Sequence, residues 1–138
     1  MTGSRSNARP VLWPKVFTVV LVLAVIVLGI SMLPRGFSEN LSAIGQGKPV
    51  AVHIYNKESV ASIDLMDILG KLRGEYEDRI ELVVADLNHE RGRRFAEQQS
   101  LGIGDLALFD AEGRRVAVIN PPHQREKLRR ALDQLAAR

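Results

Sequence analysis

Two serines three residues apart are the first residues whose types and spacing could do chemistry. Ser59 and Ser62 lie in 52-VHIYNKESVASIDLMDIL-69, where a strand pattern passes through a polar turn into an amphipathic helix. A serine hydroxyl at such a position can accept a hydrogen bond from a backbone N–H of the first helical turn. A nucleophilic serine would need an adjacent base oriented by a third group. His53 lies in the preceding strand and is not an obvious partner, so we expect Ser59 to be a helix cap and Ser62 a solvated first-turn residue.

The remaining candidates for chemistry are few. The chain contains no cysteine, which excludes disulfides, thiolate catalysis and cysteine metal sites. Its three histidines, His53, His89 and His123, are widely spaced and match no metal-ligand pattern. We expect His53 to be a sheet residue satisfied by a hydrogen bond. The sequence therefore predicts no catalytic residue, no metal, no cofactor and no small-molecule substrate.

One segment near the N-terminus is apolar on every face. The stretch from Val16 to Leu33 is interrupted only by Thr18, Gly29 and Ser31. As a helix it would extend about 27 Å, close to the roughly 30 Å hydrocarbon core of a bilayer. We therefore expect a transmembrane helix over 16–33. Gly29 and Ser31 could let a partner helix approach closely.

Charge beside this segment predicts its orientation. Arg5, Arg9 and Lys15 precede it with no acidic residue, and Trp13 stands where an interfacial aromatic belongs. Basic flanks stay cytoplasmic. We expect residues 1–15 in the cytoplasm and the C-terminal domain in the periplasm of a bacterium, anchored in the inner membrane.

A cleaved signal peptide is the alternative to a retained anchor. Its apolar region would be about 7–15 residues long and would end at a small-x-small cleavage site. The apolar run here is longer, and Pro34 and Arg35 fit cleavage poorly. The sequence favours the retained anchor.

The net charge of +3 does not indicate nucleic-acid binding. The three basic residues of the first 15 account for all of it, since the remaining 16 of 19 basic residues equal the 16 acidic ones. The exposed domain is therefore formally neutral. We interpret the arginines at 91, 93 and 94 as solvated helix surface, with lipid headgroups or an acidic partner as the alternative.

Beyond the apolar segment the chain predicts an α/β domain over 48–138, joined to the anchor by a linker over 34–47. The expected elements are strands at 48–55, 80–87, 105–110 and 114–120 and helices from Ser59 to about Gly74, from His89 to Gln99, and from about Pro122 to Ala137. The expected apolar stripes are Ile63, Met66, Ile68, Leu69 and Leu72 in the first helix and Leu128, Leu132 and Leu135 in the last. The strand at 80–87 is nearly continuous in apolar residues and is expected to be central. The order β-α-β-α-β-β-α indicates a mixed sheet with helices on both faces.

This order and the opening stretch resemble the thioredoxin-like family. In that family a strand runs into a C-x-x-C motif at a helix N-terminus, and Ser59-Val60-Ala61-Ser62 falls at that place. The family's later G-I-P-T loop corresponds to Gly102-Ile103-Gly104-Asp105. The resemblance covers about residues 47–138 and implies the family's fold.

The departures from the family's motifs change the functional expectation. Both cysteines are serine, the cis-proline position is Gly104, and the buried acid of the first strand is His53. Thiol–disulfide exchange requires a thiolate, and a helix N-terminus stabilises charge by only about 0.3–1 kcal/mol, far too little to ionise a serine. The resemblance therefore implies a redox-inactive domain that is not an enzyme.

Two classes of non-catalytic function remain open. The first is an accessory subunit of an integral membrane complex, respiratory or photosynthetic, that binds through Gly29 and Ser31 and through the periplasmic domain. The second is a peptide-binding or assembly factor that uses Ile103, Gly104 and Asp105 as a remodelled loop. An enzyme of unrelated chemistry is the least favoured class, because no acid, base and nucleophile come together in the sequence.

Overall fold

The computed structural model describes residues 3, 12–32 and 36–138. The chain divides into two compact units, Met1–Gly36 and Phe37–Arg138, which we describe separately. Most of the predicted cytoplasmic segment 1–15, and Leu33, Pro34 and Arg35, lie outside the described residues.

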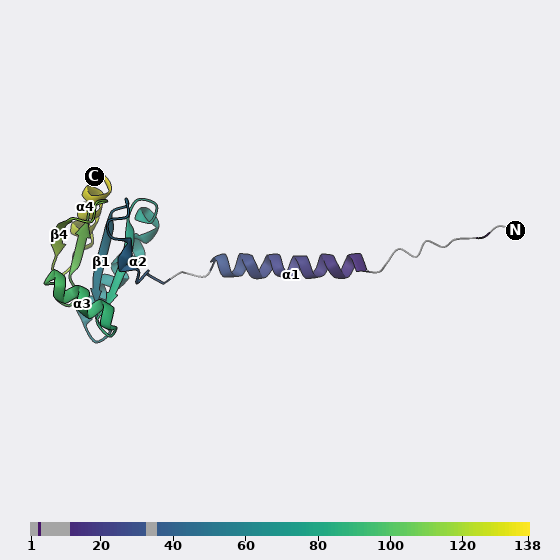
Figure 1. Cartoon of the computed structure of the whole chain (residues 1–138), viewed down its shortest axis with the longest axis horizontal. Helices are drawn as coiled ribbons and strands as arrows, with labels where there is room; N and C mark the ends of the chain where they lie inside the picture. Colours follow the sequence, from purple (N-terminus) through teal and green to yellow (C-terminus); the bar gives the residue numbers. More distant parts are fainter. Residues whose placement is uncertain (1–2, 4–11, 33–35) are drawn as a thin grey trace. The chain divides into compact units, whose positions relative to one another are not determined.

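The first unit contains one long apolar helix, α1, over Leu12–Met32 (Figure 1). Leu12–Ser31 has a mean hydropathy of 2.4, so the helix is long and apolar enough to cross a membrane. It begins four residues before the expected Val16, since Pro14 is tolerated in a first helical turn. The hydroxyls of Thr18 and Ser31 donate to the carbonyls of Pro14 and Val27, each at 2.8 Å. These bonds satisfy both hydroxyl donors within the helix, as an apolar environment would require.

The second unit is built on the expected mixed four-stranded sheet. Its strands are β1 (Val50–Tyr55), β2 (Glu81–Asp86), β3 (Leu106–Phe109) and β4 (Arg115–Ile119), in the order β2-β1-β3-β4. The β1–β2 pair is parallel, and the β1–β3 and β3–β4 pairs are antiparallel.

The expectation that the second strand is central was wrong, because β2 lies at the edge of the sheet. Its apolar sequence is explained by burial on both faces and by cover along its free edge. Ser38 bridges to Val83 there, and its carbonyl accepts a hydrogen bond from the Val84 N–H at 2.8 Å. An unpaired strand edge invites pairing with other chains, and this segment covers part of it.

Helices cover both faces of the sheet, as expected (Figure 1). Helices α2 (Val60–Tyr76) and α4 (Arg125–Ala136) pack on one face, and α3 (Glu90–Gln99) packs on the other. The stripe of α4 is the expected one, Leu128, Leu132 and Leu135. The Tyr76 hydroxyl joins α2 to α4 by donating to Asp133 Oδ1 at 2.6 Å. Burial, followed by this hydrogen bond, raises the pKa of Tyr76 to about 12.

The buried stripe of α2 differs from the expected one. It consists of Ser62, Leu65, Leu69, Leu72 and Tyr76, whose alternating spacing of three and four keeps them on one face. Ile63, assigned to the stripe from sequence, is about half exposed.

Two boundaries also differ. Pro122 was expected in the first turn of the last helix, but α4 begins at Arg125 after Gln124, and Pro121 and Pro122 form a connection with a cis peptide between them. The predicted linker 34–47 includes residues that fold onto the domain. Phe37 packs against the core beneath the Arg73 guanidinium, 5.3 Å from the ring centre, and Leu41–Ala43 form a short 3₁₀ helix, η1.

One glycine lets α3 cross closely over the end of β2. A Cβ on Gly92 would lie 2.1 Å from the Asp86 carbonyl oxygen, far inside van der Waals contact. This close approach places His89, the residue before α3, beside the end of β2.

We predict opposite effects for alanine at two helical glycines. Gly92→Ala must displace backbone and should lower the free energy of unfolding by about 1–3 kcal/mol, as overpacking does. Gly70→Ala, in α2, meets nothing within 4 Å and should raise stability by about 0.5–1 kcal/mol, the helix-propensity difference. Urea unfolding of the full chain, monitored by circular dichroism, measures the free energy of unfolding of both variants. Equal stability of the two variants would contradict the close approach.

Candidate functional site

The site predicted from the sequence gathers where the end of β1, the start of α2 and the loop before β3 meet. Ser59 is the N-cap of α2, and its hydroxyl accepts a hydrogen bond from the Ser62 N–H at 3.3 Å. The expected capping role is confirmed.

Ser62 was expected to be solvated and is instead fully buried. It is the first residue of the buried stripe of α2, so its side chain faces the sheet. Its hydroxyl lies 3.4 Å from the Ile54 carbonyl oxygen, to which it donates, and accepts from the Asn56 N–H at 3.2 Å. In the described part of the chain neither serine is hydrogen-bonded to a histidine, so no serine–base pair is formed.

Gly104 lies beside this turn, where the family resemblance expected the cis-proline loop. Its N–H donates to the Ile54 carbonyl at 2.9 Å, and its φ is +82°, a conformation that favours glycine. A Cβ there would lie 3.3 Å from the Ala61 Cβ and 3.1 Å from the Pro121 Cγ. The loop is therefore packed tightly against the first turn of α2 and against the cis Pro121–Pro122 connection.

Asp105, a predicted partner-binding residue, has its carboxylate turned inward. Its Oδ2 accepts from the Gly102 N–H and its Oδ1 from the Asn120 side-chain amide, both at 2.7 Å, and the residue is buried. This carboxylate holds the loop to the end of β4. Of the three predicted loop residues, Ile103 is the one with a large exposed side chain.

His53 is buried beneath the same region without the expected hydrogen bond. It is 1% exposed, and neither ring nitrogen has a partner among the described residues. Its ring packs edge-on against Tyr55, with centroids 5.7 Å apart. Burial, reinforced by the charge of His123, lowers the pKa of His53 to about 4. His53 is therefore a neutral side chain at pH 7. The Nε2 of His123 contacts the Gly104 carbonyl oxygen at 2.6 Å.

Three exposed apolar residues flank Gly104 and Ala61 along the chain. Val60 is 72% exposed, Ile63 49% and Ile103 48%. Among residues 37–138 they are the large hydrophobic residues that are exposed to solvent. Val60 and Ile63 are one helical turn apart, and Ile103 precedes Gly104, so they lie around one feature. We call them the apolar patch. The sequence analysis did not single out Val60 and placed Ile63 in the core. The three–four spacing from Ser62 to Tyr76 is the signal that could have assigned both residues to the exposed side of α2.

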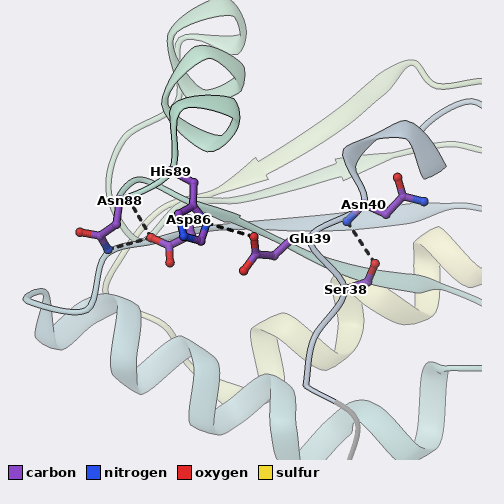
Figure 2. A network of polar contacts seen from close by, with 6 residues as sticks. All are labelled: Ser38, Glu39, Asn40, Asp86, Asn88 and His89. Atoms are coloured by element: carbon purple, nitrogen blue, oxygen red, sulfur yellow. Dashed lines mark hydrogen bonds and ion pairs between the residues drawn. The ribbon is translucent and has the colours of Figure 1, made fainter.

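A second group of polar residues lies at the junction between β2 and α3. The sequence analysis did not predict it. Glu39, Asp86 and His89 each offer a ligand atom within 4.8 Å of the others (Figure 2). Burial acts to raise the pKa of Asp86, but hydrogen bonds from Asn88 outweigh it and hold the pKa below its ordinary value. His89 is far in sequence from the other histidines, and the sequence gives no sign of its neighbours in space.

Two arginines of α3, Arg91 and Arg94, line an open cleft of about 530 Å³ between α3 and η1. Its walls are Leu41, Ser42, Glu90, Arg91, Arg94, Phe95 and Gln98. Arg94 is paired with Glu90 at 2.9 Å, which agrees with solvated helix surface.

Comparison with known proteins identifies the fold. No protein-family model and no curated protein sequence matches the chain. Among solved structures, an uncharacterized thioredoxin-like protein from Clostridium perfringens matches with a TM-score of 0.62 and 18% identity, over 72% of this chain and 79% of that protein. Thioredoxin O2 from Arabidopsis thaliana gives 0.59 at 15% identity over 69% and 84% of the two chains. Mitochondrial thioredoxin 3 from Saccharomyces cerevisiae gives 0.59 at 16% over 68% and 85%.

These identities are low enough that the likeness concerns the fold alone. The chain therefore has a thioredoxin-like fold, as the sequence resemblance implied, together with an apolar helix that could span a membrane.

The buried His53 predicts a pH dependence of stability. An unfolded chain protonates this imidazole below about pH 6.5, whereas the folded chain does so only near pH 4. The free energy of unfolding is therefore greatest with respect to His53 above about pH 6.5. It falls as the pH drops toward 4, by roughly 3 kcal/mol in total. Urea unfolding between pH 7.5 and pH 4 measures it. His53→Leu should flatten this part of the profile. A native slope in His53→Leu would contradict this account.

Proposed function

We propose that the protein is a redox-inactive, membrane-anchored accessory subunit of a bacterial inner-membrane complex, with its thioredoxin-like domain in the periplasm. The apolar patch is the observation that carries the proposal. In a domain whose other large hydrophobic side chains pack inward, exposed Val60, Ile63 and Ile103 offer a surface to a protein partner.

The local chemistry supports binding in place of catalysis. Ser62 replaces a thiol by a hydroxyl that is used in structural hydrogen bonds to Ile54 and Asn56. Ser59 caps α2. The buried base below them, His53, is held neutral and contacts no hydroxyl. A serine pair cannot form the disulfide that thiol exchange needs, so the same architecture is left with surfaces alone.

The anchor supports a membrane-bound partner. An α1 helix in the inner membrane would limit the domain to partners at or near the bilayer, and the basic flank of the helix favours a periplasmic domain. Ser31 bonds to its own helix, so with Gly29 it presents a small, satisfied surface on which another helix could pack. A respiratory or photosynthetic complex is a suitable host.

A peptide-binding or assembly factor is the second candidate, and the exposure of Ile103 beside the α2 turn favours it to a degree. The backbone of Gly104 argues for side-chain docking instead of strand pairing at that residue. Its N–H is bonded to Ile54, and its carbonyl oxygen contacts His123. An extended peptide would find both of these groups occupied.

We predict that gentle-detergent purification from native membranes recovers the tagged full chain with a constant set of integral membrane proteins at near-equal stoichiometry. Val60→Asp and Ile103→Asp place a charge in the apolar patch and should reduce recovery at least tenfold. Gln134→Asp, which introduces the same charge at an exposed position of α4, is the matched control. Mass spectrometry of the eluate quantifies all four proteins.

The outcomes separate the candidates. Many substoichiometric soluble clients, lost in the patch variants, would support the assembly factor. Recovery of the chain alone, or equal recovery of Ile103→Asp and the control, would overturn the docking role of the patch.

A further inference from the structure

Three potential metal ligands from separate segments meet at the end of β2. Glu39 comes from the segment that enters the domain, Asp86 ends β2, and His89 precedes α3. The Glu39 Oε2 lies 3.1 Å from the His89 Nδ1, and one ligand atom of each residue lies within 4.8 Å of the other two (Figure 2). Such separations can be bridged by a single ion with bonds of about 2.0–2.2 Å after small side-chain movements.

The backbone holds each of these residues in place. Glu39 follows Ser38, which is fixed on the β2 edge by its bridge to Val83, and the Glu39 carbonyl accepts from the Leu41 N–H. The His89 N–H donates to the Asp86 carbonyl at 3.0 Å. The close approach of Gly92 fixes the distance between β2 and α3.

The Asp86 carboxylate is also oriented by a neighbour outside the cluster. Its Oδ1 accepts two hydrogen bonds from Asn88, one from the backbone N–H and one from the side-chain amide, both at 2.8 Å (Figure 2). Within residues 36–138 its other oxygen makes no hydrogen bond of this kind and can take a ligand. Outer hydrogen bonds of this kind orient metal-ligating carboxylates.

A simple ion pair accounts for only part of this arrangement. His89 occupies the N-cap position of α3 without making a cap hydrogen bond, and its ring is directed at Glu39 instead. Asp86 then adds a second carboxylate beside a single imidazole, so negative charge is in excess among the three. A divalent cation would balance this negative charge.

We propose that Glu39, Asp86 and His89 bind a divalent transition-metal ion, with zinc the best match to one imidazole and two carboxylates. Zinc accepts this mixture of nitrogen and oxygen ligands in four-coordinate sites, the fourth position being taken by water. Calcium and magnesium favour six or more oxygen ligands. Because Glu39 lies in the segment that follows the anchor, the ion fastens that segment to the β2–α3 junction.

The test uses the full chain in nonionic detergent, without a histidine tag, titrated with ZnCl₂ against a colorimetric zinc indicator. We expect saturation at a single Zn²⁺ per chain and a rise in the melting temperature with zinc. Glu39→Gln and His89→Asn should each weaken binding by roughly tenfold or more and remove the rise. Glu97→Gln, at an exposed acid of the same helix α3, is the matched control and should bind like the native chain.

A second probe guards against misfolded variants. Co²⁺ bound to the native chain should give the visible absorption of a four-coordinate ion. CaCl₂ and MgCl₂ should not displace the bound Co²⁺. Absence of saturable zinc binding up to about 1 mM would overturn the proposal. So would native affinity in both Glu39→Gln and His89→Asn, since the zinc would then be bound elsewhere. None of these outcomes depends on whether the apolar patch binds a partner.

Discussion

The backbone of Ile54 is the junction on which the architecture around the two serines depends. Its carbonyl oxygen receives the Gly104 N–H and the Ser62 hydroxyl, and its N–H donates to the Asp105 carbonyl. One buried residue of β1 thereby fixes the first turn of α2 and the loop before β3. The Ile54 carbonyl already receives the Gly104 N–H, so the Ser62 hydroxyl adds a second bond to it and accepts one from the Asn56 N–H. A buried polar group without partners is costly, so a side chain that both donates and accepts suits position 62. The serine hydroxyl meets this need at position 62, so the geometry of this turn is by itself no indication of a reaction.

Element order was predictable because it depends on local signals that the sequence carries plainly. Alternation in 48–55, the Ser59 cap and the Leu128–Leu132–Leu135 stripe all describe short-range constraints, and each reappears in the structure. The place of β2 was not predictable in this way. Continuous apolarity reports burial on two faces, and an edge strand covered by Ser38 satisfies it as well as a central one does.

The candidate site divides along the same line. The positions of Ser59 and Gly104 followed from spacing along the chain. The meeting of Glu39 with Asp86 and His89, 47 and 50 positions later, could not be predicted from spacing. It depends on the close approach at Gly92 and on the Ser38 bridge. The solvated reading of Ser62 failed for a related reason. A polar residue at a helix start is normally exposed, but this one opens a buried stripe and finds acceptor and donor in the neighbouring backbone. The partnerless ring nitrogens of His53 are likewise a tertiary outcome that alternation in β1 cannot reveal.

The apolar patch is small for an independent binding site, and the membrane anchor proposed above would explain how it could suffice. A stable interface between two free proteins buries about 800 Å² on each partner, more than three side chains provide. Linking two binding elements makes the second contact intramolecular, at an effective concentration that can reach the millimolar range. If α1 and the domain contact one membrane complex, each surface needs only modest affinity, and the covalent connection supplies the rest. Folding residues 37–47 onto the domain shortens the free part of that connection. A shorter connection raises the effective concentration for partners within its reach and lowers it for those beyond. Under the proposed function, a membrane-spanning α1, a short connection and the apolar patch would together select one membrane-proximal contact.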